Sequence, residues 1–304
     1  MIRHLGYACQ NLTLGGKVLS SRTIRLKNFS LQRVAELAVK NSEDLGTIIQ
    51  WNARNKIQFF RVGSGIFPFM DHPGVGYTLG DLPGPERSQI ESNLSRAGEL
   101  ARQNNIRLSC HPGPYTCLAS PDPHTVAKSV QCLEMHSLIA DLLGYGDEFA
   151  INIHMGGVYG DKHSTAGRFL KSFCALPTAI KRRLTLENDD KPTMWSMTEL
   201  FKMVAKHCTI KLVLDVHHHR FCQQESLRDA ADMAFSTWGG FCEIPKVHYS
   251  ESRPGARPQA HSDYIKGPIP DLGDQCYDVM LETKAKELAL LAFRSNTVLS
   301  SSSV

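Results

Sequence analysis

Apolar and polar residues alternate along this chain with two different periodicities. Short runs rich in β-branched and apolar residues recur, and the longer stretches between them carry apolar residues at helical spacing. After Ser30, a residue type that suits an N-cap, the side chains of Val34, Ala38, Leu45 and Ile49 fall on one face of a helix. This alternation of strand-like and helix-like segments is typical of a βα architecture and disfavours an all-β fold or a helical bundle.

Eight strands are predicted, and helices are expected between most of them. The strands are Arg3 to Tyr7, Gln58 to Val62, Arg107 to His111, Ala150 to His154, Leu184 to Glu187, Lys211 to Asp215, Lys246 to Ser250 and Tyr277 to Glu282. The helices are Leu31 to Asn55, Pro85 to Asn104, Pro123 to Leu143, Lys162 to Leu176, Ser196 to His207, Ser226 to Phe235 and Lys284 to Phe293. In 304 residues this order favours a single α/β domain, a (β/α)8 TIM barrel, over two domains. We expect the catalytic domain to cover residues 1–295 and residues 296–304 to form a flexible tail.

Two long segments show neither pattern. Residues 63–84 and 251–276 are rich in proline and glycine, and the second leaves little room for a helix between the last two strands. Each segment follows a strand. The loops after the strands build the catalytic face of such a barrel, so we expect both segments to lie there.

Composition adds three limits to this picture. The 42% of hydrophobic residues are enough for a large core, and the net charge of +4 permits an anionic partner without requiring one. The nine cysteines are never spaced C-x-x-C, which favours reduced thiols over disulfides or a zinc ribbon. No apolar run is long enough to span a membrane and no signal-peptide pattern opens the chain. We therefore expect an intracellular protein, in the cytoplasm and nucleoid or in the nucleus, depending on the organism.

Side chains that can bind metal ions stand at or beside the ends of six strands. They are His111, His154, Glu187, Asp215, His248 and Glu282. A barrel brings these ends together on one rim. A single histidine at a strand end is more often an ordinary loop residue. Six such residues on one rim, however, would repel one another or shift one another's pKa unless cations neutralised them, so the pattern predicts a metal centre.

The residue types narrow the choice of metal. Imidazole mixed with carboxylate suits zinc, manganese or iron, and three carboxylates indicate more than one ion, with Glu187 as the expected bridge. In the sequence Asp215-Val216-His217-His218-His219, a histidine three residues after the aspartate could serve a neighbouring ion. Lys246 lies on the same side of its strand as His248, where it either anchors a phosphate or is a solvated strand start.

Eight short motifs follow one another along the chain. They are Gly6-Tyr7 with Asn11-Leu12-Thr13, Phe60-Arg61-Val62-Gly63, His111-Pro112-Gly113-x-Tyr115, Ile153-His154-Met155-Gly156-Gly157-x-Tyr159-Gly160, Leu186-Glu187-Asn188-Asp189, Asp215-x-x-His218, Lys246-Val247-His248-Tyr249-Ser250 and Ala260-His261-Ser262-Asp263-Tyr264. No single motif would suffice. The ordered set, which with Glu282 runs along nearly the whole chain, resembles the UV damage endonuclease family.

The resemblance implies an endonuclease IV-like barrel, of the kind also found in xylose isomerase, with a cluster of two or three divalent ions, most often manganese. It also implies hydrolysis of the DNA phosphodiester bond on the 5′ side of cyclobutane pyrimidine dimers and 6-4 photoproducts, which initiates excision repair. The implied metal ligands are His111, His154, Glu187, Asp215, His218, His248, His261 and Glu282. The implied catalytic residues are Glu187, Glu282 and Lys246, which lies close to the cluster. The resemblance thus adds His218 and His261, and spacing alone gives no signal for His261.

The family also implies that damaged double-stranded DNA is the partner, and we expect the protein to be a monomer. Tyr7, Asn11 and Tyr115 look like its lesion-contacting residues, and positive residues such as Arg61 are expected to hold the DNA backbone. The chain departs from the family at Pro114, where a glutamine usually precedes the tyrosine. Proline offers a stiff apolar wedge without a side-chain hydrogen bond, so we expect altered probing of lesions.

Two other activities fit the same barrel and ligands. An apurinic/apyrimidinic endonuclease IV-like nuclease would use the same centre. A metal-dependent sugar isomerase would add a compact sugar pocket with a lysine or histidine for proton transfer. A DNA-binding module without catalysis is disfavoured because every expected ligand is present. Incision assays on abasic and ultraviolet-damaged duplexes, together with a DNA-binding test, separate these hypotheses.

Overall fold

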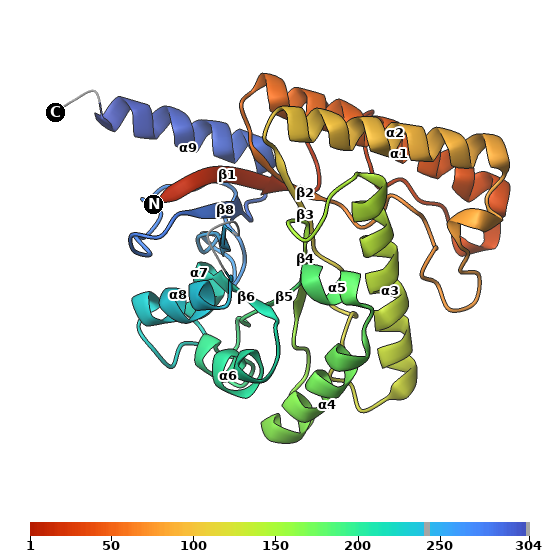
Figure 1. Cartoon of the computed structure of the whole chain (residues 1–304). Coiled ribbons are helices and arrows are strands. Elements are labelled where there is room, and N and C mark those ends of the chain that lie inside the picture. The colour runs from red at the N-terminus through yellow and green to blue at the C-terminus, as the bar shows by residue number, and fades with distance from the viewer. Residues whose placement is uncertain (240–243, 302–304) are drawn as a thin grey trace.

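The computed structural model describes residues 1–239 and 244–301, and eight parallel strands within them close into a barrel in chain order (Figure 1). The strands are β1 (Ile2–Ala8), β2 (Phe59–Val62), β3 (Arg107–Cys110), β4 (Ala150–His154), β5 (Leu184–Glu187), β6 (Lys211–Asp215), β7 (Lys246–Tyr249) and β8 (Tyr277–Leu281). The ring closes where β1 pairs with β8. The predicted (β/α)8 barrel is confirmed, and each strand end lies within one residue of its expected position.

Helices cover the outside of the barrel, and α1 packs along α2 on one flank (Figure 1). The α-helices are α1 (Leu31–Arg54), α2 (Gly84–Gln103), α3 (Pro123–Leu142), α4 (Lys162–Ala175), α5 (Thr178–Arg183), α6 (Met197–Met203), α7 (Val216–His219), α8 (Leu227–Ser236) and α9 (Lys286–Ser301). Short 3-10 helices are η1 (Leu26–Asn28), η2 (Leu79–Asp81) and η3 (Ala205–His207).

Helix boundaries differ from the prediction in three places. The expected helix from Ser196 to His207 divides into α6 and η3, because Val204 leaves the helical conformation between them (φ −126°, ψ −62°). The pattern does not reveal α5 and α7, since six and four residues are too short to show a helical period. Helix α9 continues to Ser301, through the first part of the expected tail, whose residues 302–304 lie outside the described chain.

Side-chain caps fix the points at which helices begin. The Ser30 hydroxyl accepts a hydrogen bond from the Arg33 amide at 3.1 Å, as expected of an N-cap, and the predicted apolar face of α1 is buried. Ser196 and Glu199 form a reciprocal capping box at the start of α6. These caps fix the points at which the chain enters α1 and α6 from the preceding loops.

The two irregular segments lie at the C-terminal ends of their strands, as expected. Residues 63–84 follow β2 and contain the short helix η2 before α2 begins. Residues 251–276 follow β7 without a helix, and an isolated antiparallel bridge joins Ser252 to His261. The second segment is therefore held near the barrel by pairing at a few points rather than by a continuous element.

Buried charges are balanced at the N-terminal end of the barrel. The Asp278 carboxylate, near the start of β8, is fully buried. It accepts hydrogen bonds from Arg3, with Nε at 2.9 Å and Nη2 at 2.6 Å, and from Arg107 Nη1 at 2.8 Å. Both carboxylate oxygens thus have cationic partners within the protein.

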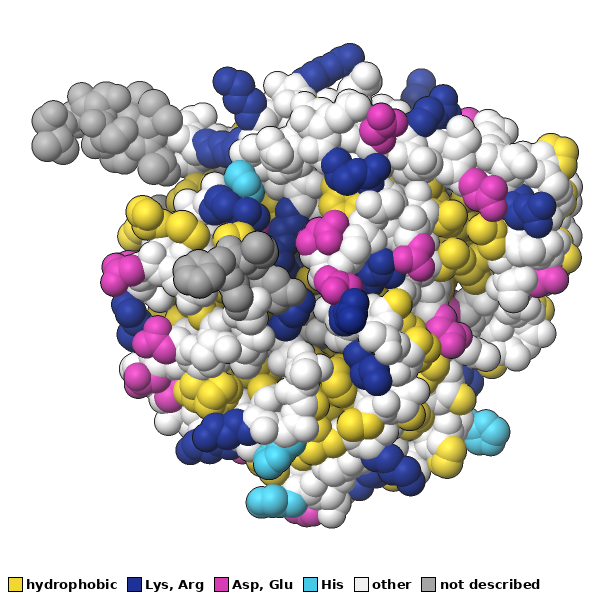
Figure 2. Space-filling view, viewed as in Figure 1, with side chains coloured by type: hydrophobic (Ala, Val, Ile, Leu, Met, Phe, Trp, Pro, Cys, Tyr) yellow, Lys and Arg dark blue, Asp and Glu magenta, His cyan; other side chains and the backbone are white. Residues whose placement is uncertain are grey.

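Eight of the nine cysteines lie in the described residues, and all eight are free thiols, as predicted; Cys242 lies outside them. None of the described helices combines the length and the hydropathy needed to cross a bilayer. Lys and Arg side chains are scattered over the face seen in Figure 2 and are interspersed with Asp and Glu.

Candidate metal centre

Glu187 stands at the centre of the predicted ligands. It ends β5, and its side chain is buried inside the barrel mouth. Its Oε2 lies 3.1 Å from His248 Nδ1, 3.3 Å from His111 Nε2 and 3.8 Å from His154 Nε2. Its Oε1 lies 3.5 Å from His218 Nδ1. Four histidines, three from the ends of β3, β4 and β7 and one from the short helix α7, therefore converge on one carboxylate.

The ligand atoms fall into two groups that share this carboxylate. His111, His154 and Glu187 form one group, and Glu187, Asp215, His248 and Glu282 form the other. Within each group the candidate ligand atoms all lie within 4.8 Å of one another. A carboxylate common to two such groups is what a bridge between two cations requires.

The two residues that the resemblance added to the ligand set also reach this centre. His218 lies one turn after Asp215, whose carboxylate accepts the His218 amide hydrogen bond at 2.8 Å, and His218 Nδ1 lies 3.8 Å from Asp215 Oδ2. His261 comes from the irregular segment after β7. Its Nδ1 lies 2.8 Å from the Glu282 carbonyl oxygen and 3.8 Å from Glu282 Oε2. The structure thus brings all eight predicted ligands together.

Polar residues behind the ligands orient them. Asn152, two residues before His154 on β4, donates a hydrogen bond to Glu187 and accepts one from Thr185 at 2.8 Å. The side chain of Asn188 accepts from the Asp215 amide at 2.8 Å and donates to its carbonyl at 3.0 Å. Sequence reasoning gave Asn152 no role, although its period-two spacing from His154 on β4 places both on the inner face.

Charges in the cluster shift its pKa values strongly. Burial, together with the Glu187 and Glu282 carboxylates, raises the pKa of Asp215 to about 7. Burial lowers the pKa of His154, but Glu187 and Asp189 outweigh it and raise that pKa to about 9. Burial and the nearby Arg61 guanidinium lower the pKa of His248 to about 3. The cluster is thus an array of mutually dependent charges rather than a set of separate ion pairs.

Two buried carboxylate oxygens of the cluster, Glu187 Oε1 and Asp215 Oδ2, have no hydrogen-bond donor among the described residues. Buried carboxylate oxygens are costly without a donor or a cation. The donor set combines imidazole nitrogens with carboxylate oxygens, which matches Mn²⁺, Zn²⁺ or Fe²⁺ better than an all-oxygen ion such as Ca²⁺. The residues present therefore fit a divalent metal cluster.

Two cationic side chains border the cluster. Lys246 is buried with 1% of its surface exposed, and its Nζ has no hydrogen-bond partner among the described residues. Burial, with Arg61 and Arg107 nearby, lowers its pKa to about 7. This burial excludes the alternative of a solvated strand start. Arg61 is also buried, pairs with Glu282 and places Nη2 3.1 Å from His248 Nε2.

The predicted DNA-contacting residues divide into exposed and buried sets. Tyr115, in the loop after β3, is 90% exposed, and Pro114 beside it is exposed as well. Tyr7 and Asn11 are buried: the Tyr7 hydroxyl donates to Asn52 Oδ1 at 2.7 Å and accepts from Asn11 Nδ2 at 2.9 Å. Tyr7 and Asn11 thus brace the loop after β1. Arg61 belongs with this buried set, because only 7% of its surface is exposed and its guanidinium pairs with Glu282.

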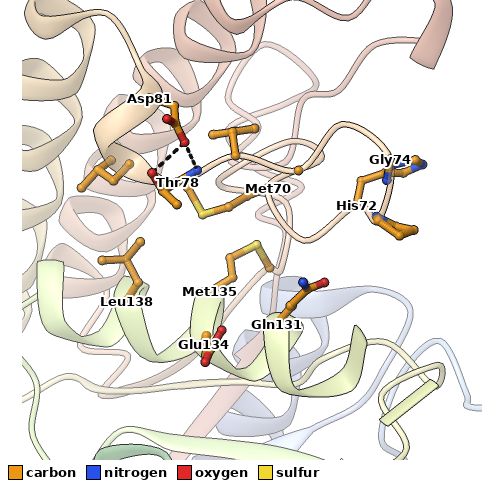
Figure 3. A pocket seen from close by; sticks show the side chains of 13 residues that line it. Met70, His72, Gly74, Thr78, Asp81, Gln131, Glu134, Met135 and Leu138 are labelled. Atoms are coloured by element: carbon orange, nitrogen blue, oxygen red, sulfur yellow. Dashed lines mark hydrogen bonds between the residues drawn. The ribbon is translucent and has the colours of Figure 1, made fainter. Parts of the chain in front are cut away.

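A cavity of about 590 Å³ lies away from these ligands, between the β2–α2 loop and α3 (Figure 3). Met70 and His72 of the loop face Gln131, Met135 and Leu138 of α3 across it. The loop is stiffened where the Asp81 carboxylate accepts hydrogen bonds from the Thr78 amide and hydroxyl, both at 2.7 Å. None of the eight predicted metal ligands lines this cavity.

Comparison with known sequences gives a consistent family. A family model described as UV-endonuclease UvdE matches residues 3–301. A UV-damage endonuclease of Schizosaccharomyces pombe is 34% identical over 307 residues that cover 94% of this chain and 49% of the relative, so the chain spans about half that relative's length. A UV DNA damage endonuclease of Bacillus cereus (strain Q1) is 32% identical, with 86% of this chain and 82% of the relative covered.

Solved structures agree. The crystal structure of SacUVDE has a TM-score of 0.84 and 30% identity, and the match covers 98% of this chain and 99% of that chain. Endonuclease IV from Thermus thermophilus has a TM-score of 0.57 at 16% identity, with 96% and 98% of the two chains covered, and that likeness concerns the fold alone.

Proposed function

The chain belongs to the UV-endonuclease UvdE family, and we propose that it is a metal-dependent endodeoxyribonuclease that cuts the DNA strand 5′ to ultraviolet photoproducts. The proposed substrates are cyclobutane pyrimidine dimers and 6-4 photoproducts in double-stranded DNA, and the cut initiates excision repair. The observation that carries this proposal is the Glu187 carboxylate, which is shared by two groups of candidate ligands at the barrel mouth.

We propose a cluster of two or three divalent ions, with Mn²⁺ as the preferred metal. The ligands would be His111, His154, Glu187, Asp215, His218, His248, His261 and Glu282. When bound, such ions supply activation of water for hydrolysis and neutralisation of charge on the scissile phosphate. The unpaired oxygens of Glu187 and Asp215 support this assignment because cations would complete their coordination.

The chain's own residues have distinct parts in the proposed reaction. Glu187 would hold a cation in each of the two ligand groups that share it, and Asn152 orients its carboxylate by a hydrogen bond. Arg61 holds the Glu282 carboxylate in place from inside the barrel. Lys246 keeps a buried amino group without a hydrogen-bond partner below the ligands, where a cationic form would stabilise negative charge on the phosphate. No covalent nucleophile is required.

DNA recognition is assigned to the exposed loop after β3. Tyr115 and Pro114 project from it and can enter a distorted duplex, whereas Tyr7 and Asn11 support the neighbouring loop from within. We propose that the protein acts as a monomer on damaged DNA, in the cytoplasm and nucleoid or in the nucleus, depending on the organism. A DNA substrate is supported by the names of its relatives.

One assay tests this function directly. A labelled duplex with a single thymine dimer is incubated with metal-stripped protein, with and without added Mn²⁺, next to undamaged and abasic duplexes. We expect Mn²⁺-dependent cutting immediately 5′ to the dimer and little cutting of the undamaged duplex. Cutting of the abasic duplex alone would favour an endonuclease IV-like activity, and no cutting of any duplex would refute the nuclease assignment.

A further inference from the structure

Six non-glycine residues in the described chain have a left-handed backbone conformation. Lys56 and Asn105 lie immediately after the C-caps of α1 and α2, where such a conformation commonly ends a helix. The other four follow strands, on the side of the barrel that holds the metal ligands: Cys9, Phe69 and Tyr159 lie in loops, and Lys286 is the first residue of α9. A left-handed conformation is unfavourable for a bulky side chain, and residues that keep it concentrate at functional sites.

Tyr159 differs from the other three in being an exposed aromatic residue. Its φ is 50°, its side chain is 47% exposed, and it follows the ligand His154 by five residues. An aromatic ring exposed to this extent offers apolar surface to a binding partner, and the tyrosine hydroxyl offers a polar contact. The backbone conformation of Tyr159 is thus unfavourable in the free protein, and its ring is accessible to a partner.

The surrounding residues hold the Tyr159 ring in place. Its hydroxyl lies 3.4 Å from Sγ of Cys117. Cys117 follows Tyr115 by two residues in the loop after β3. The Arg168 guanidinium of α4 lies 5.6 Å from the ring centroid, and its Nε donates to the Ala119 carbonyl at 2.9 Å. Arg168 therefore joins the Tyr159 loop to the loop that carries Tyr115.

Gly156 makes this arrangement possible. Its φ is 84°, and a Cβ at this position would lie 2.5 Å from Cys117 Sγ. Cys117 also contacts the Met155 carbonyl, with its Sγ at 3.6 Å. The loop with Tyr115 and the loop with Tyr159 are consequently packed together as one unit next to the ligand His154.

We propose that Tyr159 is a second aromatic contact for DNA, positioned by Cys117 and Arg168 beside the loop of Tyr115. This inference rests on the proposed function. An exposed ring fixed at the rim of the metal site can pack against a base that damage has taken out of the stack, and such packing tolerates any base. The unfavourable backbone is then explained, because the ring is held where the substrate arrives rather than where the free protein would bury it.

The test separates binding from cutting. The metal-loaded protein is titrated into a duplex that contains a thymine dimer and is already nicked 5′ to it, so that it cannot be cut there again, and into the same nicked duplex without damage. Tyr159→Gly removes the ring and relaxes the backbone, and Tyr159→Phe keeps the ring as the matched control. We expect Tyr159→Gly to weaken binding of the damaged duplex at least about fivefold, and Tyr159→Phe to remain within about twofold of wild type.

Thermal unfolding distinguishes a substrate contact from a structural role. Glycine adopts positive φ without strain, so the Tm of Tyr159→Gly is expected to equal or exceed that of wild type while affinity falls. A lower Tm with unchanged affinity, or equal affinity of all three proteins for the damaged duplex, would overturn the inference. Wild-type incision of the intact dimer duplex is measured in parallel. If it fails as well, the proposed function falls and this inference falls with it; if it succeeds, the affinities decide the role of Tyr159 alone.

Discussion

The two ends of the barrel interior hold buried carboxylates in opposite arrangements. At the N-terminal end, both oxygens of Asp278 accept hydrogen bonds from the guanidinium groups of Arg3 and Arg107. At the C-terminal end, Glu187 and Asp215 each keep one buried oxygen without a donor among the described residues. The charges are balanced within the protein at one end, and at the other they require a partner from outside.

This difference distinguishes carboxylates that stabilise the fold from carboxylates that can bind metal ions. A carboxylate bound by guanidinium groups is fully hydrogen-bonded as the chain folds, and it fixes the strands around it. A buried carboxylate that faces other carboxylates has a raised pKa, as burial, Glu187 and Glu282 raise that of Asp215, and it is stabilised when cations bind. The same residue type therefore supports the fold at one end and forms a metal site at the other.

Glu187→Gln tests the C-terminal end and has the largest expected effect. The amide cannot bridge two cations with the same charge, so we expect incision of a thymine-dimer duplex to fall by roughly a thousandfold or more. The fold should persist, as measured by circular dichroism, because the substitution is isosteric. Near-normal incision at saturating Mn²⁺ would remove Glu187 from the cluster.

Asp278→Asn is the matched change at the N-terminal end. It removes the negative charge to which Arg3 and Arg107 donate hydrogen bonds, and we expect the free energy of unfolding to fall by about 3 kcal/mol. Urea unfolding measures this loss. Metal content and incision per folded molecule should stay near wild type, and a selective loss of metal would show that the two ends are not independent.

The metal-free protein should lose stability through Asp215 as pH rises. Its pKa is about 7 in the folded protein and near 4 when unfolded, so between these values the folded state binds more protons than the unfolded state. The stability difference between wild type and Asp215→Asn should therefore grow by about 1.4 kcal/mol per pH unit at most from pH 4 to pH 7. Urea titrations of both proteins in a chelator measure it, and a flat difference would contradict the assigned pKa.

Tyr115→Ala tests the exposed rim above the ligands. We expect a loss of about 1–3 kcal/mol in binding of a dimer-containing duplex, because stacking contributes about that much per base. Undamaged duplex should bind nearly as before, since phosphate contacts dominate non-specific binding. Competition titrations with both duplexes measure the ratio, and equal losses would assign Tyr115 a purely structural role.

Pro114→Gln has the smallest expected effect. Glutamine can supply a side-chain hydrogen bond next to Tyr115, which is worth about 0.5–1.5 kcal/mol. We therefore expect kcat/KM for thymine dimers to rise roughly two- to tenfold. The gain should be smaller for 6-4 photoproducts, which distort the duplex more. Incision kinetics on both lesions provide the comparison. An unchanged ratio between the lesions in the variant would show that position 114 does not sense damage.

The strands and most ligands could be predicted because they follow from the periodic spacing of apolar residues along the chain. Alternation within each strand and the common rim of the barrel are enough to place His111, His154 and Glu187 together. His261 gave no such signal, because it lies in an irregular loop. Its position beside Glu282 depends on how that loop folds back onto the barrel, which the sequence pattern does not show. The burial of Arg61 could not be predicted either. The sequence around β2 does not show whether this arginine faces solvent or a carboxylate.

Helices of four or six residues are too short to show a helical periodicity of apolar residues in the sequence. The sequence Val216 to His219 forms α7 because the Asp215 side chain caps the His218 amide, which also directs His218 toward Glu187. Local capping, rather than an apolar stripe, thus decides the geometry of this ligand. Such a contact depends on the backbone angles of two or three residues, which no apolar spacing encodes.

The irregular segment between β7 and β8 has an effect on chain entropy. Ordering a backbone costs about 1–2 kcal/mol per residue. In this segment the bridge from Ser252 to His261 and hydrogen bonds from the Lys266 and Gly267 amides to the Glu251 carboxylate offset part of that cost. A metal ion bound by His261 would act as a crosslink between this segment and the barrel, closing a long loop much as a disulfide does. The segment that supplies this ligand would then be ordered partly by the metal that it helps to bind.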